Sequence, residues 1–267
     1  MKTRVLGKSN SLVTNSSYPK EAYALLSEGE NNHFWFRGRN MVIRSVIQSS
    51  LHNYQGMRFL EVGCGTGYVL SALAKMGFVV TGLDMHHEGL VYARQRVPAA
   101  DFFVGTIDQF RPKQRFDAVG MFDVLEHILD DSTALLSCSR LLKKNGMLYI
   151  TVPARPELWS VYDDISGHKR RYTKDSLVKA LTVAGFRIRS VSYFGFFQYI
   201  PHLVMKRLIL SQSGSTANDM MPVLKKVIWQ PPGILNWLLE QSFVLDMFLS
   251  KFVGLPFGTS LIVSAQK

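Results

Sequence analysis

The sequence predicts an α/β fold in which a doubly wound, mostly parallel sheet is covered by helices on both faces. Three observations support this class. Short apolar runs alternate with segments of helical periodicity from residue 57 onward, a glycine-rich turn follows the first run, and polar residues gather where the runs end. Because ligands bind beyond the carboxyl ends of parallel strands, these polar residues form the candidate site.

The first strand, turn and helix form the most informative unit of the sequence. An apolar run over 57–62 predicts a buried strand, and residues 68–76, with apolar side chains on one face, predict a helix. Between them stand three alternating glycines: Gly63, Gly65 and Gly67. Because glycine has no Cβ, a ligand can lie against bare backbone here and meet free N–H groups at the helix start.

The residues around these glycines indicate which kind of ligand the turn binds. A dinucleotide site has the spacing G-x-G-x-x-G and seats a pyrophosphate. Here the glycines alternate, Cys64 lies between the first two, and Glu61 precedes the first by two positions. Since the Glu61 carboxylate repels a pyrophosphate, the pattern favours a cationic ligand that carries an amino group.

The second and third units add residues suited to a nucleoside. An apolar run over 78–84 predicts a strand that ends at Asp84 and Met85, followed by a helix over 88–96. An acid at this place accepts hydrogen bonds from both ribose hydroxyls, and capping of the next helix is the alternative. A third strand is expected over 101–105, which puts the next three residues beside an adenine: Thr106, Ile107 and Asp108.

The fourth and fifth units complete the alternation of strands and helices. A strand over 116–122 leads from Phe122 into Asp123, and both should line the ligand's pocket. A helix over 132–142 and a fifth strand over 147–153 follow. This order predicts a parallel sheet wrapped on both faces, with every polar motif at one edge.

This combination resembles the class I S-adenosylmethionine (SAM)-dependent methyltransferases, whose first motif is an acid followed by alternating glycines. The resemblance implies a Rossmann-like, doubly wound sheet of seven strands, with SAM as the cofactor. It also implies that SAM contacts the residues at the strand ends: Glu61, Gly63, Cys64, Gly65, Gly67, Asp84, Met85, Thr106, Ile107, Asp108, Phe122 and Asp123. The family often has an acid where this chain has Thr106, so either Asp108 or backbone groups supply the adenine contact.

The chain divides into a SAM-binding domain and attached segments. The domain is expected over 57–198 and 258–267, where runs over 186–194 and 260–265 form an antiparallel pair of strands at the sheet edge. The attached segments are a flexible polar leader, an N-terminal helical cap or lid, and a helical insertion: residues 1–17, 18–56 and 199–257.

The insertion is apolar and helical. Its helices are expected over 199–210 and 234–252, and charged residues interrupt both before they reach the length that crosses a bilayer. Three roles stay open for it: contact with an anionic membrane, a lid or wall of the acceptor pocket, and a dimer interface. The basic and aromatic side chains that suit a membrane surface are Lys225, Lys226 and Trp229.

The net charge of +11 is unevenly distributed. Residues 57–153 carry ten basic and ten acidic side chains, whereas the segments 1–56, 154–198 and 199–267 carry +4, +4 and +3. Basic segments around a neutral domain indicate an anionic acceptor or surface, and scattered charge that serves solubility is the alternative. Nucleic acid is a disfavoured partner, because no basic stripe is interleaved with stacking aromatic residues.

Two motifs in the basic segments are candidates for acceptor binding. Residues 33–40 could form a lid over the cofactor or simply anchor the N-terminal helix, and residues 159–172 follow the fifth strand, where the acceptor should enter. The alternative for the second motif is a structural loop whose arginines pair with Asp163 and Asp164. The candidate acceptor-binding residues are Trp35, Arg37, Arg39, Tyr162, Arg170, Arg171 and Tyr172.

Two histidines are the candidate catalytic residues. An oxygen acceptor must lose a proton during methylation, and His127 and His168 can take up protons near neutral pH. They belong to the motifs Asp-Val-Leu-Glu-His and Gly-His-x-Arg-Arg-Tyr, which resemble those of a bacterial methyltransferase subgroup with no settled acceptor. No spacing matches a dedicated metal site, so no metal is expected.

The predicted function is SAM-dependent transfer of a methyl group to an oxygen of a small or lipid-linked metabolite. Cys64 and Cys138 form no disulfide framework and no signal peptide is evident, which indicates the cytoplasm, with peripheral contact at the inner face of the membrane as an extension. Two alternatives stay open: a nicotinamide-dependent oxidoreductase and a non-catalytic SAM-binding or scaffold protein.

Overall fold

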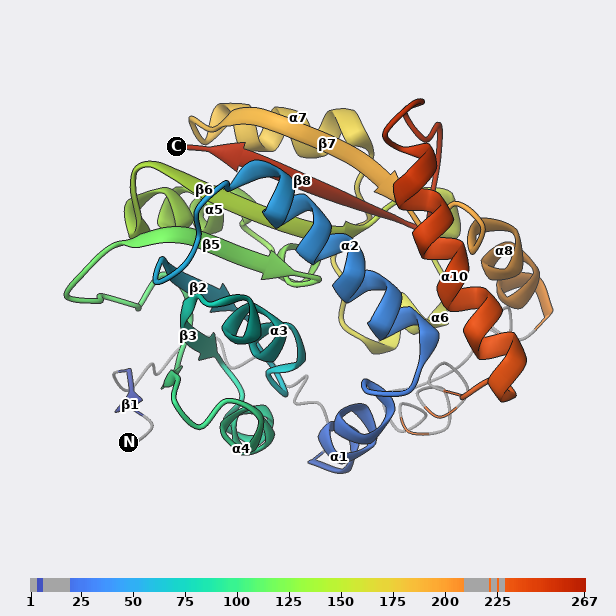
Figure 1. The fold of residues 1–267 in the computed structure, drawn as a ribbon, viewed down its shortest axis with the longest axis horizontal. Helices are drawn as coiled ribbons and strands as arrows, with labels where there is room; N and C mark the ends of the chain where they lie inside the picture. The colour runs from blue at the N-terminus through green and yellow to red at the C-terminus, as the bar shows by residue number, and fades with distance from the viewer. Residues whose placement is uncertain (1–3, 7–19, 209–220, 222–224, 226–228) are drawn as a thin grey trace.

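The computed structural model describes residues 4–6, 20–208, 221, 225 and 229–267. Its centre is one sheet with the strand order β1-β4-β3-β2-β5-β6-β8-β7 (Figure 1). Among the described strands, only β8 runs in the direction opposite to all the others. The strands are Arg4–Val5 (β1), Arg58–Val62 (β2), Val79–Asp84 (β3), Asp101–Val104 (β4), Phe116–Phe122 (β5), Leu142–Pro153 (β6), Arg187–Phe194 (β7) and Ser260–Gln266 (β8).

The prediction of seven strands was wrong by one. The additional strand, β1, is two residues long and pairs in parallel with β4, in the register Arg4 opposite Phe103. It lies within the segment expected to be a leader, and its brevity hides it from any periodicity pattern. The rest of that segment, residues 1–3 and 7–17, lies outside the described residues. The last two strands form the predicted antiparallel pair, with β7 at the sheet edge.

Helices cover both faces of the sheet. On one face α2 (Phe34–Ser50), α3 (Tyr68–Met76) and α4 (His87–Arg96) share a core with Phe59. On the other, α5 (Asp131–Leu141) and α7 (Lys174–Val183) share a core with Leu60, which points the opposite way because side chains alternate along a strand. The remaining helices are α1 (Lys20–Gly29), η1 (Leu125–His127), η2 (Pro156–Leu158), α6 (Val161–Ile165), α8 (Tyr199–Leu208) and α10 (Gly233–Leu249).

The long helix α10 packs mainly on α2 and also contacts β7 at the sheet edge (Figure 1). The crossing is close because Gly38 has no side chain: a Cβ there would lie 2.2 Å from the ring of Phe243. None of the helices in the described ranges combines the length and the apolar character that crossing a membrane requires. Lys226 and residues 209–210, which belong to the predicted insertion, lie outside the described residues.

Candidate active site

The glycine turn joins β2 to α3 in the conformation that its sequence predicts. Gly63, Gly65 and Gly67 all have positive φ, at 68°, 50° and 76°, a region that favours glycine. The amide of Gly65 donates to Asp84 Oδ2 over 2.7 Å, and His86 N donates to Asp84 Oδ1 over 2.8 Å. Asp84 therefore fixes the turn from the end of β3, and a Cβ added at Gly65 would meet only open space.

A pocket opens at this turn and is lined from two directions. Glu61, Phe122 and the turn form its floor, and Glu30, Arg39 and Tyr23 enter from the N-terminal cap. Glu61 is buried and its Oε2 atom has no hydrogen-bond partner among the described residues. Burial raises the pKa of Glu61 well above its usual range, although the nearby Arg39 opposes the shift. An unpartnered acid beside bare glycine backbone fits a ligand with a cationic amino group.

The N-terminal cap is tied to the glycine turn by polar contacts. The hydroxyl of Thr66 donates to both carboxylate oxygens of Glu30, over 2.7 Å and 2.6 Å, and Arg96 forms an ion pair with the same carboxylate. Arg39, expected to face the acceptor or the cofactor, lines this pocket and forms an ion pair with Asp123, which is not part of the lining. Sequence reasoning missed Glu30, because nothing in its polar surroundings distinguishes it from a surface residue.

Met85 and the three residues predicted beside the adenine lie at the ends of β3 and β4. Met85 and Asp108 are exposed, whereas Ile107 is buried in the core. The hydroxyl of Thr106 is buried and has no partner among the described residues, so it is free to bind a ligand. None of the four belongs to the described pocket lining, which ends at the glycine turn.

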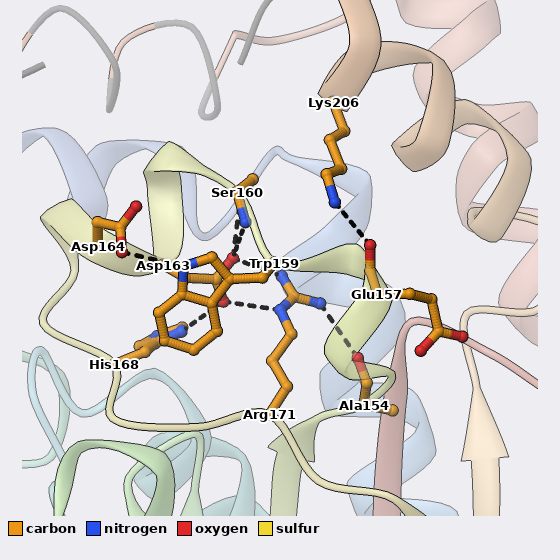
Figure 2. Close-up of polar contacts among 9 residues, drawn as sticks. All are labelled: Ala154, Glu157, Trp159, Ser160, Asp163, Asp164, His168, Arg171 and Lys206. Carbon is orange, nitrogen blue, oxygen red and sulfur yellow. Dashed lines mark hydrogen bonds and ion pairs between the residues drawn. The ribbon is translucent and has the colours of Figure 1, made fainter. Parts of the chain in front are cut away.

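The two candidate catalytic histidines lie together beyond the ends of β5 and β6. The ring centroids of His127, in η1, and His168 are 4.7 Å apart, and the rings are nearly perpendicular. His168 Nδ1 lies 2.8 Å from Asp163 Oδ1, and Arg171 holds the same carboxylate with two hydrogen bonds of 2.7 Å and 3.0 Å (Figure 2). Although burial acts in the opposite direction, these contacts hold the pKa of the fully buried Asp163 well below its usual range.

Glu126 lies beneath this pair. Its side chain is fully buried and neither carboxylate oxygen has a hydrogen-bond partner among the described residues. Burial and the nearby Asp123 raise the pKa of Glu126 well above its usual range. Burial and the neighbouring His168 lower the pKa of His127 to about 4, so its ring is neutral at physiological pH and has a free lone pair.

Most of the other candidate acceptor residues are engaged in the structure. Arg171 and Tyr172 are buried, with the Tyr172 hydroxyl donating to Asp131 over 2.8 Å and Arg170 pairing with the same carboxylate. Trp35 packs against Phe194 and Phe243. Arg37 pairs with Glu240 of α10 at 3.0 Å, and the ring of Tyr162 lies 6.2 Å from that of His168. Arg171 therefore fits the alternative in which residues 159–172 form a structural loop, because it pairs with Asp163.

Comparisons with known proteins agree with this geometry. The family model described as "Methyltransferase domain" matches residues 35–191. A probable SAM-dependent methyltransferase of Mycolicibacterium smegmatis is 29% identical over 58% of this chain, and a ubiquinone biosynthesis O-methyltransferase of Bradyrhizobium diazoefficiens is 31% identical over 38%. The chain spans 60% and 42% of the lengths of these two relatives.

Solved structures show the same fold. A methyltransferase structure from Bacillus halodurans has a TM-score of 0.54 at 18% identity and covers 84% of this chain and 98% of its own. The magnesium protoporphyrin IX methyltransferase of Synechocystis, solved with the demethylated cofactor product bound, has a TM-score of 0.52 at 18% identity and covers 86% of this chain and 84% of its own.

The fold and the glycine-turn pocket together define a class I SAM-dependent methyltransferase, with SAM as its cofactor. The chain belongs to the methyltransferase domain family whose model it matches. Membership of this family argues against the nicotinamide-dependent oxidoreductase that the sequence left open, and the methyl-transfer experiment below tests the non-catalytic alternative.

Proposed function

We propose that this enzyme methylates an oxygen atom of a small or lipid-linked metabolite, and that His127 and His168 activate that oxygen. The observation that carries the proposal is the pair of imidazoles at the carboxyl ends of β5 and β6, with His168 fixed by the buried Asp163. Such a pair suits an acceptor whose hydroxyl has to lose a proton. The naming of relatives as O-methyltransferases supports the same acceptor atom.

The residues of the chain divide the work of this reaction. SAM supplies a methyl group already activated on a sulfonium. Glu61, the glycine turn and Asp84 bind the cofactor, with Phe122 and Asp123 beside it. Tyr23, Glu30 and Arg39 of the N-terminal cap line the pocket at the turn and would exclude water from the cofactor. Tyr162, whose ring lies 6.2 Å from that of His168, would border the acceptor. Alignment of the acceptor oxygen with the methyl group and exclusion of water then account for most of the rate.

The lipid-linked acceptor class is supported by the unusual polarity of α10. Its polar side chains face inward: Asn236 bonds to the backbone of the cap, Glu240 pairs with Arg37, and Asp246 accepts from Phe196 N over 2.9 Å. Its apolar side chains face outward and are exposed: Ile234, Leu235, Trp237, Leu238, Val244, Leu245 and Phe248. A continuous apolar face of this kind marks a binding surface.

We assign this outward face to peripheral contact with an anionic bilayer. Exposed Trp229 and Phe252 lie at the two ends of α10, where aromatic rings suit the headgroup region. Lys225 and Lys251 are exposed nearby, and the whole chain carries a net charge of +11. Because α10 packs on the cap helix α2, a lipid surface against α10 would bring lipid-linked acceptors to the cap side of the active site.

Methyl transfer from labelled SAM tests the reaction. We expect the label to appear in an organic or aqueous extract of bacterial cells incubated with the purified chain. Mild base should leave the product intact, because an ether is stable where a methyl ester is hydrolysed. His168→Ala should reduce transfer at least tenfold while SAM binding is retained, and a label found on nitrogen would contradict the proposed acceptor atom.

A further inference from the structure

We propose that Glu126, His127 and His168 form a binding site for a divalent metal ion. One ligand atom from each of the three side chains lies within 4.8 Å of the other two. Glu126 and His127 come from η1, at the end of β5, whereas His168 comes from the loop after α6. Small rotations of the side chains would bring these atoms to the shorter distances of a metal's coordination sphere.

The state of Glu126 is the strongest reason to expect a cation here. A fully buried carboxylate is costly unless it is paired, and both oxygens of Glu126 lack a hydrogen-bond partner among the described residues. The nearest basic side chain in its electrostatic surroundings, Arg39, already pairs with Asp123. A metal ion between Glu126 and the imidazoles would supply the missing partner.

The surroundings of His168 match those of a metal ligand. Metal-binding histidines usually donate their second ring N–H to a carboxylate, which fixes the ring and its tautomer. His168 makes this contact with Asp163 through Nδ1, over 2.8 Å, and Arg171 in turn fixes Asp163 (Figure 2). The Nε2 atom of His168 is thereby directed away from Asp163 with its lone pair available.

Two imidazoles and one carboxylate are a ligand set for Zn²⁺, Mn²⁺ or Fe²⁺, and three protein ligands leave positions open. Of the three residues His127 has the most solvent-exposed surface, although its ring is largely desolvated, so solvent can approach the site from its side. This role rests on the proposed function: the ion would bind the acceptor oxygen and lower the pKa of its hydroxyl. The proton then leaves to water, the oxygen attacks the methyl carbon, and the carbon–sulfur bond breaks with its electron pair retained by sulfur.

Zn²⁺ binding to the full chain tests the inference without any acceptor. Bound metal is first removed with a chelator, the chelator is removed in turn, and Zn²⁺ is then added. We expect the chain to bind one Zn²⁺, as measured by competition with a chromophoric chelator and by elemental analysis. The two test variants are Glu126→Gln, which keeps the shape of the side chain, and His168→Ala. Each should lower Zn²⁺ affinity at least about tenfold. His52→Ala, which removes an exposed histidine after α2, is the matched control and should bind Zn²⁺ normally.

SAM affinity measured on the same variants reports whether they are folded. X-ray absorption of the unmodified chain with Zn²⁺ bound should show two imidazole nitrogens at the metal. This measurement needs no variant, so misfolding of a variant cannot affect it. Absence of Zn²⁺ binding, equal binding by Glu126→Gln and the unmodified chain, or a spectrum without imidazole would overturn the inference. Full methyl transfer after metal removal would also overturn it while leaving the proposed function intact.

Discussion

Asp84 shows how a single carboxylate organises the cofactor site. Both of its oxygens accept backbone hydrogen bonds, from Gly65 and His86, so it holds the turn and the start of α4 together. We expect Asp84→Ala to weaken SAM binding by about 10- to 100-fold, because hydrogen bonds to a charged group contribute about 1.5–3 kcal/mol. Calorimetric titration with SAM measures this, with the exposed Asp101→Ala as control. Unchanged affinity in Asp84→Ala would refute the assignment.

Asp163 is the residue on which the loop around His168 depends. Replacing it with Asn leaves the buried guanidinium of Arg171 without its charge partner, and loss of one member of a buried ion pair costs about 3–5 kcal/mol. We therefore expect Asp163→Asn to lower the melting temperature markedly in a thermal scan. Asp164→Asn is the matched control, because Asp164 is exposed and accepts a hydrogen bond from the indole of Trp159. Equal melting temperatures for the two variants would contradict this role.

Individual residues also show where sequence reasoning succeeds and fails. The glycine turn and Asp84 were predictable, since their chemistry is local: a strand ends, the backbone needs positive φ, and an acid follows at a fixed distance. The partnership of Glu126 and His127 with His168 was not, because the fold alone brings these separate segments together. Spacing rules for metal sites describe ligands on one element, so a cluster that two separate segments form lies outside those rules.

At the scale of elements, the crossing of α2 and α10 depends on one glycine. A methyl group at Gly38 would overlap the ring of Phe243, which is itself fully buried. We expect Gly38→Ala to destabilise the fold by about 1–3 kcal/mol, the usual cost of overpacking, as measured by urea unfolding. Gly233→Ala is the control at the start of α10, because an added Cβ there meets nothing within 4 Å. Equal unfolding midpoints for Gly38→Ala and Gly233→Ala would contradict the tight packing of α2 against α10 at Gly38.

The elements of the central sheet were also more predictable than the attached ones. Strands β2 to β6 follow apolar runs whose length and alternation with helices leave few other arrangements. The role of α10 could not be predicted from its composition, because apolar residues in a helix normally indicate a buried face. Here polar contacts from Asn236, Glu240 and Asp246 join the buried Phe243 in holding the helix to the domain, and most of its other apolar side chains are left outside.

At the scale of the whole molecule, the positive charge and the outward face of α10 act together. We expect the chain to sediment with vesicles containing phosphatidylglycerol and to bind poorly to pure phosphatidylcholine, with binding reduced by salt. Replacing Trp237 and Phe248 with Ser should weaken vesicle binding by roughly tenfold or more, because each ring loses its burial in lipid. Val183→Ser removes an equally exposed apolar side chain from α7 and is the control.

The vesicle experiment also separates membrane contact from self-association. A dimer formed through the same face would shift in mass on size-exclusion chromatography when Trp237 and Phe248 are replaced, in the absence of any lipid. Vesicle binding that is unchanged in the double variant would refute the assignment of α10 to the bilayer.

The position of β8 has a consequence for how the chain is made. The final strand lies between β6 and β7, so β7 has no neighbour in the sheet until residues 260–266 are in place. During translation, the strands that carry the cofactor turn are synthesised first and can pair with one another early. The sheet edge closes only after residues 260–266 have been synthesised, and until then β6 and β7 each expose an open edge that a chaperone or a second nascent chain can contact.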